Sequence, residues 1–62
     1  MDDALRAYDV GRADGLAGLR DHVMATDPDM GADYRVGLAD GQLELFQKNL
    51  LAAVRRALGD AA

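Results

Sequence analysis

The chain repeats one short motif, Tyr8-Asp9-Val10-Gly11-Arg12-Ala13-Asp14-Gly15, as Tyr34-Arg35-Val36-Gly37-Leu38-Ala39-Asp40-Gly41. Six of the eight positions are identical, at an offset of 26 residues, in the pattern Y-x-V-G-x-A-D-G. Both copies lie in segments with helical periodicity, although a glycine inside a helix costs roughly 1 kcal/mol relative to alanine. Glycines four residues apart form a flat stripe on which a second helix backbone can lie. The repeat therefore predicts a glycine-mediated helix pair with approximate internal two-fold symmetry.

Apolar residues at three- and four-residue steps indicate two helices separated by a turn. We expect the first helix at about residues 4–25, the turn at about 26–33 and the second helix at about 34–58. Pro28 disfavours helical geometry at the residue before it, and Gly31 can turn the chain. The second helix starts with Asp33 as its cap, or alternatively at Pro28 with Asp27 as its cap. The prediction is an all-α fold, a two-helix antiparallel hairpin that forms one domain over residues 1–62.

The repeat supplies the residues expected to pack between the helices: Tyr8, Gly11, Gly15, Gly18, Tyr34, Gly37 and Gly41. A hairpin that turns near residues 27–30 brings Gly15 and Gly18 close to residues 36–41. Strict two-fold symmetry of an antiparallel pair would instead place Gly11 against Gly41, about one helical turn away. The sequence leaves both registers open, and it also leaves open whether the contact lies within or between chains.

The second helix carries two apolar faces. The broader face comprises Val36, Leu43, Phe46, Leu50, Leu51, Val54, Ala57 and Leu58, and the opposite stripe comprises Tyr34, Leu38, Gly41, Leu45 and Ala52. One face can cover the first helix, and the other is then left for a partner; we assign Leu38, Leu45 and Ala52 to the partner interface. A 62-residue chain without cysteine has little core of its own. We therefore expect a homodimer with a four-helix arrangement.

The charge of the chain is −4 and is unevenly distributed. Residues 1–33 contain eight acidic residues, whereas residues 45–59 contain Lys48, Arg55 and Arg56 and no acid. The net negative charge argues against a general nucleic-acid binder, and cations near the end of a helix complement its dipole. No apolar run approaches the length of a membrane span and no signal peptide is visible, so we expect no membrane contact and a cytoplasmic location.

Candidate chemistry is sparse. Asp14 and Asp40 are equivalent in the repeat and could form a carboxylate pair, but no histidine, cysteine or further acid is placed beside both, so solvation or pairing with an arginine is the better interpretation. The acids of residues 27–33 resemble a calcium loop only faintly, because its twelfth position is Leu38 rather than glutamate. His22 is the only histidine, and serine and cysteine are missing from the chain. We expect no catalytic residue, no metal and no cofactor.

The segment Ala7–Gly18 resembles the first helix of ribosome modulation factor and its small relatives, which read A-x-x-x-G-x-x-x-G-x-x-G at the same steps. The second helix of that family carries an aromatic residue followed three residues later by glycine, as Tyr34 and Gly37 do here. The resemblance covers about residues 7–41 and implies a two-helix hairpin. Its ribosome-bound members silence ribosomes through ribosomal RNA. That family is strongly basic, whereas this chain is acidic.

These observations predict a small non-enzymatic interaction or regulatory protein that acts through helix–helix association with itself and with a protein partner. The alternative is a ribosome- or RNA-associated factor like the family it resembles. In that case the contacts to RNA would come from Arg35, Lys48, Arg55 and Arg56.

Overall fold

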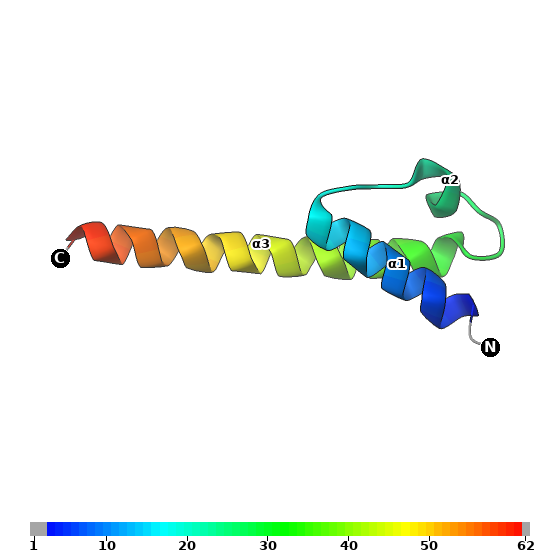
Figure 1. Ribbon diagram of the computed structural model, residues 1–62, viewed down its shortest axis with the longest axis horizontal. Helices are drawn as coiled ribbons and strands as arrows, with labels where there is room; N and C mark the ends of the chain where they lie inside the picture. The colour runs from blue at the N-terminus through cyan, green and yellow to red at the C-terminus, as the bar shows by residue number, and fades with distance from the viewer. Residues whose placement is uncertain (1–2, 62) are drawn as a thin grey trace.

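The computed structural model describes residues 3–61, and its regular elements in that range are all helices (Figure 1). They are α1 (Asp3–Ala17), a short α2 (His22–Ala25) and α3 (Gly31–Ala61). The all-α prediction is confirmed. The boundaries differ from the prediction: the first helix ends at residue 17 rather than 25, and the second starts earlier and ends later than residues 34–58. Association into a four-helix arrangement stays a prediction.

The first helix ends early because Gly18 terminates it. Gly18 has a φ of 73°, the left-handed conformation that glycine adopts without strain. The Leu19 amide donates to the Asp14 carbonyl at 2.8 Å, and the Gly18 amide donates to the Gly15 carbonyl at 3.2 Å. These two bonds form a Schellman motif, which satisfies carbonyls at the end of the helix.

Asp27 caps the start of α3. Its side-chain Oδ1 accepts hydrogen bonds from the amides of Asp29 at 2.8 Å and Met30 at 2.9 Å, and its carbonyl accepts from the Gly31 amide at 2.8 Å. Pro28 occupies the next position, where a missing amide proton costs nothing. The prediction of Asp33 as the cap is wrong, since Asp33 lies inside the first turn of α3.

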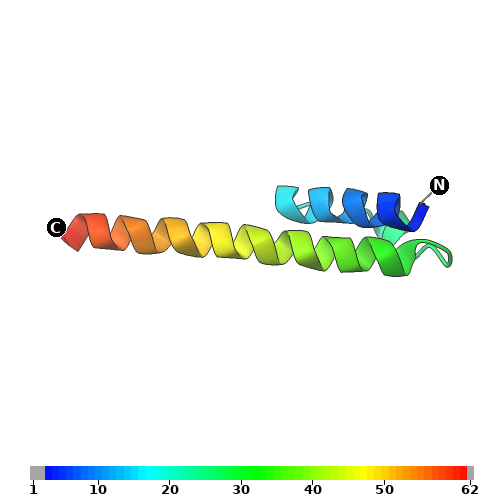
Figure 2. The ribbon, with the colours of Figure 1, turned by 90° about the horizontal axis from the view of Figure 1, so that it is seen from below.

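The two long helices run parallel, so the prediction of an antiparallel hairpin is wrong. Figures 1 and 2 show α1 and the first half of α3 side by side and pointing the same way. Residues 18–30 connect them by running back along α1, with α2 in the middle of this return. The geometry allows this, because thirteen residues can span about 40 Å when extended, whereas the 15-residue α1 is only about 22 Å long.

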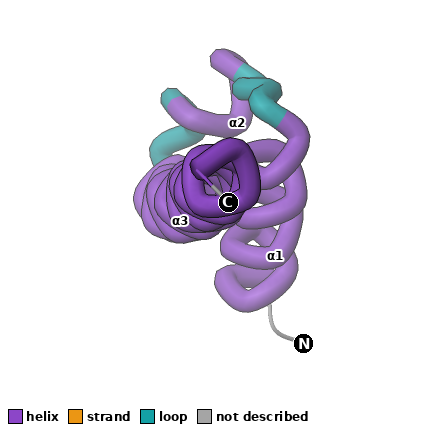
Figure 3. Tube along the Cα trace, turned by 90° about the vertical axis from the view of Figure 1, so that its left-hand side faces the viewer, coloured by secondary structure: helices purple, strands orange, loops and turns teal. Residues whose placement is uncertain are grey.

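The core is small and lies where α1 and α2 meet the start of α3. It consists of Ala7, Ala25, Tyr34 and Leu38, with Met24 and Met30 packed against it. Figure 3, which looks along α3, shows α1 beside it and α2 across the pair. Tyr34 is fully buried and is therefore the residue around which the three helices meet.

The packed body of the molecule consists of α1, α2 and the first half of α3, and the second half of α3 projects beyond it. The molecule measures 52 × 22 × 12 Å, and its radius of gyration is 15.1 Å. A compact chain of this length would have a radius of gyration of about 11 Å. Residues 46–59 are all exposed. The fold therefore consists of a packed body and a long bare helix.

Candidate functional site: the helix pair and the outer face of α3

The helix pair is built on a backbone contact at Gly11 and Gly37. A Cβ atom added at Gly11 would overlap the carbonyl of Tyr34 and approach the Leu38 amide. A Cβ atom at Gly37 would overlap the carbonyl of Tyr8 and approach the Arg12 amide. The two sets of contacts are equivalent under the 26-residue repeat. Each motif copy thus contacts the other copy in the same way.

Gly15 and Gly41 repeat this arrangement one turn further on. A Cβ atom at Gly15 would overlap the Leu38 carbonyl, and one at Gly41 would overlap the Arg12 carbonyl. Contacts on α3 advance together with those on α1, as parallel helices require. Each residue of α1 therefore lies beside the residue 26 positions later, and the contact is within one chain. Both antiparallel registers considered from the sequence are wrong.

Gly18 does not belong to this contact, contrary to the prediction. It lies beyond the end of α1, and a Cβ atom placed on it would meet nothing within 4 Å. Its function is to end the helix through its left-handed conformation. The sequence pattern of three small residues on one edge could not reveal this, because a C-terminal glycine and a packing glycine have the same spacing.

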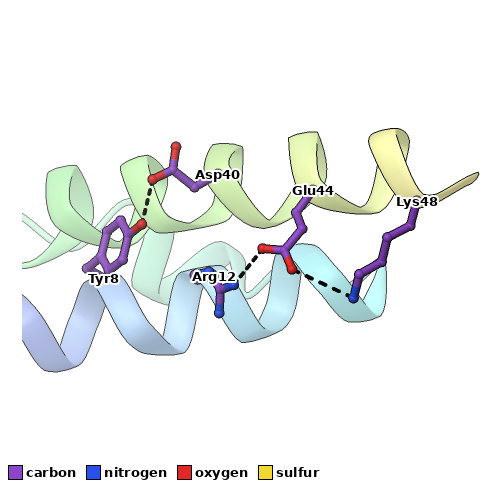
Figure 4. A network of polar contacts seen from close by, with 5 residues as sticks. All are labelled: Tyr8, Arg12, Asp40, Glu44 and Lys48. Atoms are coloured by element: carbon purple, nitrogen blue, oxygen red, sulfur yellow. Dashed lines mark hydrogen bonds and ion pairs between the residues drawn. The ribbon is translucent and has the colours of Figure 1, made fainter. Parts of the chain in front are cut away.

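Two tyrosine–aspartate hydrogen bonds cross the helix pair. The Tyr8 hydroxyl donates to Asp40 Oδ2 at 2.6 Å, as Figure 4 shows, and the Tyr34 hydroxyl donates to Asp14 Oδ2 at 2.6 Å. Each bond joins the tyrosine of one motif copy to the aspartate of the other. The sequence contains the signal for this arrangement, since tyrosine and aspartate are six residues apart in both copies. Solvation or pairing with an arginine was expected for these carboxylates, and a tyrosine hydroxyl is the partner of each instead.

Tyr34 also holds in place residues 18–30, the return segment between α1 and α3. Its hydroxyl oxygen accepts a hydrogen bond from the Asp21 amide at 2.7 Å, while the Asp21 side chain caps α2 by accepting from the Met24 amide. Burial of the phenol, and then its hydrogen bond to Asp14, raise the pKa of Tyr34. At Tyr8 the pKa is raised mainly by the hydrogen bond to Asp40. Both phenols are thus favoured in their neutral, donating form.

An exposed ion-pair chain extends the contact toward the end of α1 (Figure 4). Arg12 Nη2 lies 2.5 Å from Glu44 Oε1, and Lys48 Nζ lies 3.7 Å from Glu44 Oε2. This part of the contact does not follow the repeat, because the residue equivalent to Arg12 is the buried Leu38. Exposed pairs of this kind contribute about 0–1 kcal/mol each.

The four cations considered for RNA contact are spread along α3. Arg35 donates from Nη1 to the Ala25 carbonyl at 2.6 Å, so it satisfies the end of α2. Lys48 joins Glu44, and Arg55 and Arg56 lie exposed on the projecting half. Arg35 and Arg55 are twenty residues apart on one helix, about 30 Å. The structure does not bring these four residues together.

The face of α3 that covers α1 is the opposite of the one predicted. Leu38, assigned to the partner interface, is only 6% exposed and lies in the core; Leu45 is half-buried, and Ala52 is exposed beyond the end of α1. The reason is that Gly37 and Gly41 face α1 on the same side as Tyr34 and Leu38. The broader apolar face is left bare. We call it the outer face, and it comprises Val36, Leu43, Phe46, Leu50, Leu51, Val54 and Leu58, each at least 45% exposed.

Within residues 3–61, no group of three or more histidine, cysteine or acidic side chains is placed so that it could hold a metal ion. Asp14 and Asp40 each accept a tyrosine hydroxyl from the opposite copy. His22 lines an open hollow beside α2 together with Arg20 and Asp21. Asp14 and Asp40 thus act as hydrogen-bond acceptors between α1 and α3, and His22 takes no part in that contact.

Among residues 3–61, no helix combines the length and the apolar character needed to cross a membrane. Comparison of the chain with models of protein families, with curated proteins and with solved structures finds no match.

Proposed function

We propose that this chain is a small, cytoplasmic, non-enzymatic interaction protein whose outer face of α3 binds an apolar face of another helix. The observation that supports this proposal is the outer face itself: seven large apolar side chains, each 45–67% exposed, follow one side of a projecting helix. Continuous apolar surface of this size on a soluble chain marks an interaction site. Helix-in-groove recognition uses anchors at three- and four-residue steps, as here.

The outer face is not used in the packing of α3 against α1. Helical residues advance by about 100° each, which places Leu43, Leu50 and Val54 on the side of α3 opposite Gly37 and Gly41. The contact with α1 is made by those glycines. The body therefore orients α3 while leaving its other side bare for a partner.

A photo-crosslinking residue placed at position 50 or 52 tests the proposal in cells that produce the protein. Both positions are exposed and lie in the same part of α3, but only position 50 is on the outer face. We expect protein adducts at position 50 and few at position 52. Equal adducts at both positions, or none at position 50, would contradict the proposed function.

RNA association is the second candidate, and the observation that favours it is the acid-free run 45–59 with Lys48, Arg55 and Arg56 on a projecting helix. Phosphate contacts release counterions, so binding of this kind weakens steeply with salt. Co-sedimentation with ribosomes that is lost on adding salt and in an Arg55→Glu, Arg56→Glu variant would support it. Absence of co-sedimentation at low salt would remove it.

A further inference from the structure

We propose that the outer face binds the outer face of a second copy of this chain, with the two α3 helices antiparallel. This inference rests on the proposed function and names its partner. It draws on three features of α3: the position of the outer face relative to the body, the order of charges along one edge of that face, and the length of the face.

The charges along one edge of the outer face change sign from one end to the other. At about 100° per residue, Asp40, Glu44, Lys48 and Arg55 fall along the same edge. The acids come first in the chain and the bases last. When two copies of such an edge meet antiparallel, the acids of one copy face the bases of the other. In a parallel pair the two copies of this edge would lie on opposite sides of the interface, and this complementarity would be lost.

A specific register follows from the apolar residues. If Leu43 faces Val54 of the second copy, then Phe46 comes level with Leu51, and Arg55 comes level with position 42. Position 42 lies on the other side of α3, but its height along the helix axis is midway between Asp40 and Glu44. Arg55 of the second copy therefore comes level with these two acids, on the edge that carries them, and its guanidinium reaches both carboxylates. One oxygen of Asp40, Oδ2, accepts from Tyr8, and Glu44 already accepts from Arg12. The body thus holds both acids in position for the second copy.

The length of the outer face suits this partner. It runs from Val36 to Leu58, about 33 Å, and an antiparallel pair centred near residue 48 covers all of it on both copies. Its seven large side chains offer an area on the order of the ~800 Å² per partner that stable interfaces bury. Because α1 lies on the other side of α3, the two acidic bodies sit at opposite ends of the pair and do not collide.

The solution mass, measured by sedimentation equilibrium over a range of concentrations, tests the partner. We expect a dimer for the parent chain and for Ala52→Asp, and a monomer for Leu50→Asp, since a buried charge at the interface should raise the dissociation constant roughly a hundredfold or more. Tyrosine near-ultraviolet circular dichroism reports whether the body remains folded in each variant. A parent chain that stays monomeric, or a Leu50→Asp variant that dimerises as the parent does, would overturn the inference.

Two further experiments test the antiparallel orientation of the two α3 helices and the contribution of Arg55 to the dimer. The chain contains no cysteine, so a mixture of Leu43→Cys and Val54→Cys chains should oxidise to the mixed disulfide in preference to either homodimer. A parallel pair would instead give the Leu43→Cys homodimer. Arg55→Glu should weaken the dimer while Arg56→Glu, off the outer face, should not; equal effects would contradict the proposed register.

The crosslinking experiment at position 50 separates failure of this inference from failure of the proposed function. Adducts of the chain with itself support both. Adducts only with a different protein overturn the second copy as the partner but leave the proposed function standing. No adduct overturns both.

Discussion

Tyr34 donates a hydrogen bond of 2.6 Å to Asp14 across the helix pair, and the same residues exchanged between the motif copies, Tyr8 and Asp40, make the equivalent bond. A slip of one helix turn would break both bonds and leave only one glycine of each motif copy in the contact. The crossed bonds and the glycine contact therefore specify one register together.

Gly41→Ala should destabilise the protein although alanine favours helix. The new Cβ atom would overlap the Arg12 carbonyl, so the helices must separate. We expect a net loss of about 1–3 kcal/mol of unfolding free energy, as for overpacking in a core. Gly59→Ala is the matched control, because nothing lies within 4 Å of its Cβ position and only the helix propensity changes. Thermal unfolding followed by circular dichroism compares the two; a Gly41→Ala variant that melts higher than the parent contradicts the backbone contact.

Tyr34→Phe should cost more stability than Tyr8→Phe. The Tyr34 hydroxyl is buried and joins Asp14 to the Asp21 amide, so its removal leaves a carboxylate and an amide unpaired, at a cost of about 1–3 kcal/mol. Tyr8 is half-buried, but its bond to Asp40 is exposed, so water can replace the lost bond. Chemical denaturation of both variants measures the difference. Equal losses would show that the return segment does not depend on Tyr34.

Stability should fall in alkaline solution. The pKa of Tyr34 is raised in the folded state, above its ordinary value of 10.0, by burial and by the bond to Asp14. From about pH 10 the unfolded chain has lost a proton that the folded chain still holds, so the free energy of unfolding decreases as pH rises toward the folded-state pKa. Denaturation between pH 8 and 11.5 should show this decline. It should be shallower in Tyr34→Phe; an identical decline in that variant would assign it to other groups.

Leu38→Ala and Leu43→Ala distinguish the two faces of α3. Leu38 is 6% exposed and Leu43 is 56% exposed. Truncating the buried side chain should cost about 2–5 kcal/mol, whereas truncating the exposed one in dilute solution should cost well under 1 kcal/mol. Thermal melts at low protein concentration provide the comparison. If Leu43→Ala lost more stability than Leu38→Ala, the broad apolar face would be the one that covers α1, as the sequence predicted.

The sequence predicts the helical class and the glycines at the contact, because periodicity and the repeat are local signals. It does not predict the direction of the pair. A glycine stripe is compatible with either direction, and the choice depends on residues 18–30, where Gly18 ends α1 and Asp21 and Asp27 cap the next two helices. Each cap is a short-range feature. The caps together determine whether residues 18–30 run back along α1, which gives a parallel pair, or turn tightly, which gives an antiparallel hairpin.

The sequence shows that α3 has a broad apolar face, but it does not show whether this face covers α1 or is left exposed. Both faces of α3 are apolar, and the broader one would bury more surface against α1. The structure selects the narrower one because the glycines and Tyr34 lie there. Backbone approach and the crossed hydrogen bonds outweigh the larger apolar area, and area alone gives the wrong face.

The distance between spin labels tests the parallel pairing most directly. Arg6 and Ala32 are exposed and lie 26 residues apart, so they are neighbours in a parallel pair; Asn49 is exposed and lies about 25 Å further along α3. Labelled cysteine pairs at 6 and 32, and at 6 and 49, are diluted with unlabelled chain so that only distances within one chain are read. We predict that the 6–32 distance is shorter than the 6–49 distance by roughly 20 Å. A shorter 6–49 distance would mean an antiparallel hairpin and would contradict the account.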